Sequence, residues 1–206
     1  MAYALVRRTF LLLAQPWLRF RVVGQERIPV SGPAVLVAAH RSWLDPPCIL
    51  GASPRAVSFL ILDTVYARPW AGWLYRAVRA IPVSGGGTGS LAGTREALRR
   101  LDGGGLVGVF PEGRVFGQDT PGALRPGAAM LAVRARARVV PIHIQGSAEA
   151  WPRGHALPRR GRVVVHVGPP LDPPEAQRGA VAALTERIGE TLATLARQVG
   201  AAGGPR

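Results

Sequence analysis

The sequence contains no lysine, because all 26 basic residues of this 206-residue chain are arginine. A Walker A phosphate loop needs its lysine and a Schiff-base enzyme needs an amine nucleophile, so both chemistries are excluded. Cysteine is almost absent as well, since Cys48 is its one occurrence. A single thiol rules out a disulfide scaffold and a structural zinc cluster, and it fits a reducing compartment.

Long apolar runs are missing too. A membrane-spanning helix needs about 20 apolar residues, and the longest runs here, at 10–14 and 34–39, are far shorter. The first of them follows Arg7 and Arg8 but stops at Pro16, with no small-residue cleavage site behind it. This is not the pattern of a secretory signal, so we expect the protein to stay in the cytoplasm.

Acidic residues are scarce, and 12 Asp and Glu against 26 Arg give a formal net charge of +14. Such a balance attracts nucleic acid, an anionic membrane surface or small anionic substrates. The arginines are scattered singly along the chain, and no motif of a nucleic-acid-binding module is visible. We therefore expect an anionic lipid surface or an anionic substrate as partner, and no nucleic acid.

Residues 1–20 mix leucines and aromatic residues with arginines. This pattern predicts an amphipathic helix, broken near Pro16, that lies on the membrane interface. Each buried Leu or Phe contributes roughly 1.5 to 3 kcal/mol, against about 1 kcal/mol for each arginine near an anionic leaflet. The alternative is a first helix packed on the protein's own core, because periodicity does not distinguish these two destinations.

Beyond residue 34, short β-rich runs alternate with helical stretches, which is typical of an α/β fold. We expect a single domain, with a central mostly parallel or mixed sheet flanked by helices. It spans residues 21–199, between the amino-terminal segment 1–20 and a flexible tail at 200–206. The predicted strands are 34–39, 57–62, 81–83, 106–110, 139–144 and 163–167, and the predicted helices begin near 46, 70, 90, 126 and 173.

The sharpest local pattern lies between His40 and Asp45. An apolar strand ends at His40, and Asp45 stands directly before Pro46, which has the form of a helix N-cap followed by proline. Both side chains then lie where open α/β sheets bind ligands. Asp45 can orient the imidazole, which becomes a general base through its other nitrogen. The alternative is that Asp45 only caps the helix and His40 is a hydrogen-bonded loop residue.

A second polar corner follows the strand at 106–110. This strand runs directly into Pro111, Glu112, Gly113 and Arg114. If it lies parallel to the strand before His40, both corners line one pocket at the same edge of the sheet. Taken alone, Pro-Glu-Gly is an ordinary turn.

Together these residues resemble the glycerolipid acyltransferase family, whose best-known member makes phosphatidic acid from lysophosphatidic acid. The resemblance covers roughly residues 20–170. Its four blocks, in the family's order, are an HxxxxD motif from His40 to Asp45, an FPEG motif from Phe110 to Gly113, Arg125-Pro-Gly127 before an apolar helix, and a strand from Val140 to Gly146 that contains Val-Pro. HxxxxD alone is a weak signal, whereas four blocks in order are specific.

The resemblance implies the transfer of a fatty acyl group from a thioester, on coenzyme A or acyl carrier protein, to a hydroxyl of a lysolipid or glycerol-phosphate-type acceptor. His40 would take the hydroxyl proton and Asp45 would hold the imidazole, without a covalent acyl-enzyme and without a metal or cofactor. The enzyme would work at the cytoplasmic face of the cell membrane, as a peripheral or monotopic protein. Substrate binding falls to Arg41, Ser42, Phe110, Pro111, Glu112, Gly113 and Arg114.

Two positions depart from the family pattern. The family usually has an arginine for the acceptor phosphate after its Ile-Pro-Val strand, where this chain has Ser84, and a basic residue two places beyond FPEG, where it has Val115. Arg79, Arg114 and Arg125 are substitutes, since a guanidinium suits phosphate from several directions. A lysophospholipid, an amine-containing lipid and another alcohol stay open as acceptors. So does the alternative of an inactive lipid-binding relative.

Other aromatic and histidine residues carry weaker signals. Trp70, Trp73 and Tyr75 suit an acyl tunnel, insertion at the bilayer or packing under the sheet. His143 points from a predicted strand, which favours a core or surface role over a ligand role.

Overall fold

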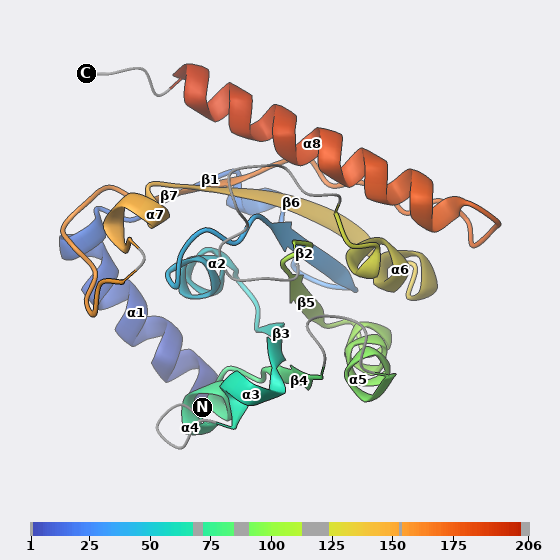
Figure 1. The fold of residues 1–206 in the computed structure, drawn as a ribbon, viewed down its shortest axis with the longest axis horizontal. Helices are drawn as coiled ribbons and strands as arrows, with labels where there is room; N and C mark the ends of the chain where they lie inside the picture. Colours follow the sequence, from blue (N-terminus) through green and yellow to red (C-terminus); the bar gives the residue numbers. More distant parts are fainter. Residues whose placement is uncertain (1, 68–71, 85–90, 113–123, 153, 203–206) are drawn as a thin grey trace.

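A seven-stranded sheet forms the centre of the computed structural model, which describes residues 2–67, 72–84, 91–112, 124–152 and 154–202. The strands lie in the order β1-β7-β6-β2-β5-β3-β4 (Figure 1). Their bounds are β1 (Arg21–Val23), β2 (Ala34–Ala38), β3 (Val57–Leu62), β4 (Ile81–Val83), β5 (Leu106–Val109), β6 (Arg138–Gln145) and β7 (Val164–Val167).

Helices connect and cover the strands. Their bounds are α1 (Ala2–Leu18), the 3-10 helix η1 (Gln25–Arg27), α2 (Asp45–Ala52), α3 (Asp63–Tyr66), α4 (Gly72–Ala77), α5 (Leu91–Asp102), α6 (Gly127–Arg134), α7 (Ser147–Ala150) and α8 (Ala180–Ala202). Strands β2, β3, β4, β5 and β6 pair in parallel, whereas β7 runs antiparallel to β6 and carries β1 in parallel beside it. The expected α/β fold with a mixed, mostly parallel sheet is confirmed.

The register of three strands brings their carboxyl ends together. Val37 of β2 lies opposite Val109 of β5, and Ala38 lies opposite Ile142 of β6. The chain segments that follow these strands therefore leave the sheet at one edge. This edge is where ligands bind in open parallel sheets.

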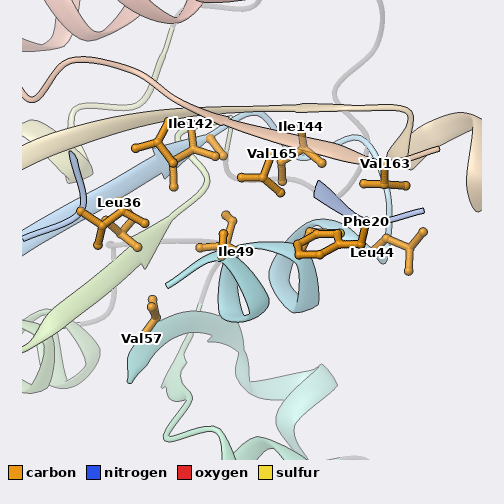
Figure 2. Packing of buried hydrophobic residues seen from close by; sticks show 14 of the residues in the cluster. Phe20, Leu36, Leu44, Ile49, Val57, Ile142, Ile144, Val163 and Val165 are labelled. Atoms are coloured by element: carbon orange, nitrogen blue, oxygen red, sulfur yellow. The ribbon is translucent and has the colours of Figure 1, made fainter. Parts of the chain in front are cut away.

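Two apolar layers pack on the two faces of the sheet. On one face, side chains of β2, β6 and β7 meet α1 and α2, and Figure 2 shows Leu36, Ile142 and Ile144 near Ile49 of α2. On the other face, helices α5, α6 and α8 cover the sheet. Leu184 and Ile188 of α8 are fully buried there, so one side of this helix packs on the sheet.

Three local predictions were wrong or incomplete. Helix α1 is not broken near Pro16: the proline stands in the last turn, so its missing N–H affects only the end of the helix. Helix α8 begins at Ala180 and not at Pro173, because Gly179 adopts φ +84° directly before it. The three-residue strand β1 was not predicted, because it forms by pairing with β7, which lies far away in the chain.

Helix α1 is buried on one side and exposed on the other. Ala14 and Leu18 are buried, and the ring of Phe10 meets that of Phe20 edge-on at 5.6 Å. By contrast, Leu12 is 74% and Leu13 66% exposed. Helix α1 therefore packs on the protein's own core with one apolar side and leaves a second apolar side exposed, where it could meet a membrane interface. Within the described residues, none of the helices combines the length and apolar character that crossing a membrane requires.

Candidate active site

The local fold turns the side chain of Asp45 back toward His40. His40 follows β2 by two residues, and Asp45 is the first residue of α2, with Leu44 at the N-cap. The prediction that Asp45 caps the helix was therefore wrong. The carboxylate of Asp45 accepts hydrogen bonds from the loop that precedes the helix, and the N-cap residue Leu44 makes no side-chain cap bond.

These donors surround the carboxylate of Asp45. Its Oδ2 lies 3.0 Å from His40 Nδ1 and accepts the backbone N–H groups of Arg41 at 2.6 Å and Ser42 at 2.7 Å. Its Oδ1 accepts the hydroxyl of Ser147 at 2.6 Å. Asp45 is 1% exposed, and a buried charge of this kind is tolerated only with such a set of hydrogen bonds.

This arrangement fixes the tautomer of His40. A carboxylate only accepts hydrogen bonds, so Nδ1 must carry the proton toward Asp45. In the neutral ring the lone pair then lies on Nε2. A neutral histidine held in this way is suited to take a proton from a substrate, while the carboxylate stabilises the imidazolium that results.

Aromatic stacking restrains the imidazole on its flat side. The rings of His40 and Phe110 are stacked at 4.2 Å between centroids and 20° between planes. Phe110 in turn stacks on Phe59 of β3 at 5.9 Å. The absence of a side chain at Gly108 makes room for this, because an added Cβ would lie 2.4 Å from Phe59 Cε1. Phe110 therefore lies in the site and contacts the imidazole of His40, the predicted base.

The second predicted corner joins the first at the same edge of the sheet. The backbone N–H of His40 donates to Glu112 Oε2 at 3.4 Å. Pro111 stands beside Arg125, whose backbone N–H donates to the Pro111 carbonyl at 2.9 Å. The structure thus brings together His40, Asp45, Phe110, Pro111, Glu112 and the backbone of Arg125. Gly113 and Arg114 lie outside the described residues.

Two residues of the first block have different surroundings. Arg41 is exposed at the edge of the loop. Ser42 is fully buried, and its hydroxyl donates to the Trp151 carbonyl at 3.2 Å while accepting the N–H of Leu44 at 3.2 Å. The hydroxyl of Ser42 thus holds the loop in shape.

Arg79 does not join this group. Its carbonyl accepts a hydrogen bond of 2.7 Å from Arg100, whose guanidinium also donates to Ser58 Oγ at 2.7 Å. Ser58 is the second residue of β3, so this cluster lies toward the amino-terminal edge of the parallel strands. Ser84, in the position where the family has an arginine, ends the described part of the β4 segment.

Ser147 is the site residue that sequence reasoning missed. It follows Gly146, which adopts φ +83° and passes so close to Arg162 that an added Cβ would lie 2.0 Å from its carbonyl oxygen. The signal was a Gly-Ser pair directly after the Val-Pro strand, at the edge where the other polar groups gather. Only the register of β6 on β2 shows that its hydroxyl reaches Asp45.

Two other titratable groups lie near the site. Burial, and then the negative charge of Asp45, raises the pKa of the Cys48 thiol well above its usual value. Burial, the neighbouring His166 and the Arg41 cation lower the pKa of His143, which the Asp45 charge partly opposes. In the part of the chain that the structure describes, no three His, Cys, Asp or Glu side chains gather as metal ligands would.

Several known proteins are similar to this chain. Residues 19–145 match the family model described as Acyltransferase. A 1-acyl-sn-glycerol-3-phosphate acyltransferase of Bacillus subtilis (strain 168) is 24% identical over 180 residues, which cover 85% of this chain and 87% of that protein. An N-acylphosphatidylethanolamine synthase of Arabidopsis thaliana is 31% identical over 144 residues, covering 64% of this chain and 51% of the relative.

A solved structure shares the fold. The 1-acyl-sn-glycerophosphate (LPA) acyltransferase PlsC from Thermotoga maritima superposes with a TM-score of 0.74 at 23% sequence identity. The match covers 96% of this chain and 78% of the other.

Proposed function

The chain belongs to the acyltransferase family, and from this premise we propose that it moves a fatty acyl group from a thioester to a hydroxyl of a lysolipid or glycerol-phosphate-type acceptor. The thioester is carried by coenzyme A or acyl carrier protein. The observation that carries the proposal is the hydrogen bond of 3.0 Å between His40 Nδ1 and Asp45 Oδ2, at the edge of the sheet where Glu112 also lies.

His40 acts as the general base of this reaction. Its Nε2 takes the proton of the acceptor hydroxyl while the hydroxyl oxygen attacks the thioester carbonyl. The C–S bond then breaks, and the imidazolium returns the proton to the leaving thiolate, so that an ester and a free thiol are formed. Asp45 stabilises the imidazolium between these two steps, and no covalent acyl-enzyme is needed.

Glu112 and Phe110 hold the base and border the acceptor. The carboxylate of Glu112 accepts a hydrogen bond from the backbone N–H of His40, and the ring of Phe110 covers the imidazole. The FPEG corner takes the acceptor in this proposal, together with Arg41 at the exposed edge of the loop. Arg125 is the candidate for the acceptor phosphate, since its backbone is hydrogen-bonded to Pro111.

The enzyme works on a membrane surface, which we place at the cytoplasmic face of the cell membrane. Exposed apolar side chains on α1 and α4 support this: Leu5 is 68%, Leu12 74% and Trp73 61% exposed. The two helices contact each other. An interfacial protein uses such side chains, with arginines beside them, to reach lipid substrates.

The acceptor is identified with purified protein and an acyl thioester. Lysophosphatidate, lysophosphatidylcholine, glycerol 3-phosphate and phosphatidylethanolamine are offered separately, and the products are identified by mass spectrometry. We expect acylation of a hydroxyl-bearing lysolipid. Acylation of the phosphatidylethanolamine amine alone would place the enzyme with the Arabidopsis relative. Tight lipid binding without release of thiol would show that the protein is an inactive lipid-binding relative of these enzymes, which is the alternative given above.

A further inference from the structure

A hollow of about 360 Å³ lies at the carboxyl end of α1, on a part of the surface that the reaction does not use. We call it the Trp17 hollow. Two chain segments line it, with Pro16, Trp17 and Arg19 from the first and Arg160, Gly161 and Arg162 from the second.

Hydrogen bonds between the two segments hold the walls of the Trp17 hollow. The N–H of Gly161 donates to the Trp17 carbonyl at 3.2 Å, and the N–H of Val163 donates to the Leu18 carbonyl at 2.9 Å. The Trp17 indole N–H donates to the Pro158 carbonyl at 3.1 Å. The last two carbonyls of α1, whose partial negative charge would repel an anion, thus already accept hydrogen bonds.

The hollow is strongly cationic. The guanidinium of Arg160 lies over the Trp17 ring at 4.9 Å. Among the described residues, no carboxylate comes within 4.0 Å of Arg19, Arg160 or Arg162. The sequence explains this, because segments 1–25 and 150–171 each contain four arginines and neither Asp nor Glu. Planar guanidinium groups that have no carboxylate partner suit a phosphate.

Apolar side chains lie beside the hollow on the same helix. Leu13 precedes Trp17 by one helical turn, and it is 66% exposed, while Trp17 itself is 43% exposed. A small soluble phosphate compound has no apolar part that would contact these exposed side chains. A phospholipid presents both a phosphate and an acyl region, and tryptophan with its polar tip bonded suits the boundary between them.

The second wall of the hollow belongs to a segment that also contacts the loop between His40 and Asp45. The same connection between α7 and β7 carries Trp151, whose carbonyl holds the Ser42 hydroxyl, and Arg160. Figure 1 shows this connection, in orange, beside the carboxyl end of α1. A lipid bound at the hollow would therefore lie against the segment that supports the site.

From these observations we infer that the Trp17 hollow binds the phosphate of an anionic phospholipid headgroup and docks the enzyme on the membrane. This inference rests on the membrane association in the proposed function. It adds a lipid site that is separate from His40 and that the acyl transfer does not require.

The test is sedimentation with phosphatidylcholine vesicles that contain or lack phosphatidylglycerol, without any substrate. The variant Arg160→Gln/Arg162→Gln is compared with Arg187→Gln/Arg197→Gln, which removes the same charge from exposed positions on α8. We expect the first to lower partition onto anionic vesicles on the order of tenfold to thirtyfold. The α8 variant should bind as the wild type does. Thermal melting confirms that each variant is folded, and Arg160→Gln alone replaces the pair if the pair is unstable.

The other outcomes separate the inference from its premise. If the wild type binds neither kind of vesicle, the membrane association fails as well. If both double variants lose binding equally, the net positive charge of the protein is responsible, and the Trp17 hollow is not a lipid-binding site. Release from vesicles by dilute glycerol 3-phosphate would reassign it to a soluble phosphate. Capture of acidic acyl carrier protein that Arg160→Gln/Arg162→Gln abolishes, with vesicle binding intact, would overturn the lipid assignment.

Discussion

The hydroxyl of Ser147 donates a hydrogen bond of 2.6 Å to Asp45 Oδ1, although the two residues are 102 positions apart in the chain. Each is 1% exposed, and each is the first residue of its helix, α7 and α2. The bond ties the carboxyl end of β6 to the loop that carries His40. Asp45 therefore depends on a strand that lies outside the HxxxxD motif.

We predict that Ser147→Ala lowers kcat by about tenfold with little change in KM. The reason is that a hydrogen bond to a charged group contributes roughly 1.5 to 3 kcal/mol, and its loss lets the Asp45 carboxylate turn away from the imidazole. Steady-state thiol release measures both constants, and Ser147→Thr should restore most of the rate. Ser53→Ala is the control, since it removes another buried hydroxyl, bonded to the Arg55 carbonyl. A wild-type kcat in Ser147→Ala would remove Ser147 from the positioning of the base.

Gly108→Ala should damage both stability and activity. The new Cβ would meet Phe59, which stacks on Phe110, which stacks on His40. Overpacking of this kind costs about 1 to 3 kcal/mol, and the displaced ring moves the imidazole. Urea unfolding and thiol release measure the two effects.

The matched substitution is Gly200→Ala, where an added Cβ meets nothing within 4 Å. It should be neutral or stabilising, because alanine is favoured over glycine in a helix by about 1 kcal/mol. If Gly108→Ala behaved in the same way, the stacked rings would not position His40.

Cys48 should resist alkylation in the native protein. Burial and the charge of Asp45 raise the pKa of its thiol, so it remains protonated and out of reach of solvent. Iodoacetamide labelling followed by mass spectrometry should show an unmodified native protein and full labelling in urea. Rapid native labelling with loss of activity would contradict the burial of this side chain.

Stability should fall as the pH drops below about 6.5, the ordinary pKa of histidine. Burial lowers the pKa of both His143 and His166, so in this range the unfolded chain binds protons that the native protein does not. The contribution of these two neutral histidines to the free energy of unfolding is complete above the ordinary histidine pKa and is lost as the pH falls below it. Burial acts directly on the ring of His166, since its Nε2 is buried without a hydrogen-bond partner among the described residues.

The check is urea unfolding of wild type and His166→Phe at about pH 7.5 and about pH 5.5. The free energy of unfolding of the variant should depend less on pH than that of the wild type. His155→Phe, at an exposed position, should keep the wild-type dependence. Equal pH dependence in all three proteins would show that His166 is not the group responsible.

The sequence predicts the parts of the site that depend on local order. His40 and Asp45 stand five positions apart around a strand end and a helix start, so their meeting follows from the chain between them. The shared edge of β2 and β5 follows from the parallel sheet, which the alternation of elements indicates. The prediction that Asp45 is the N-cap was wrong because backbone N–H groups of the preceding loop bind its carboxylate in place of those of the helix. Residue preferences for cap positions do not indicate which of these two sets of donors is bound.

The rest depends on contacts between distant segments. Ser147 reaches Asp45 only through the register of β6, and Arg79 is kept away from His40 by the position of β4 beside β3. The exposed side of α1 illustrates the same limit, since the pattern of leucines does not tell which of them face the core. Such contacts are properties of the packed sheet and helices, so no local window of sequence contains them.

The measurement that tests the account most directly is the rate of thioester consumption by His40→Ala in the presence of a lysolipid acceptor. Loss of the general base should lower the rate by about 10² to 10⁴, while the control His155→Ala, in the exposed loop before β7, keeps the wild-type rate. A folded His40→Ala protein that consumes thioester as fast as the wild type would contradict the assignment of His40 as the base.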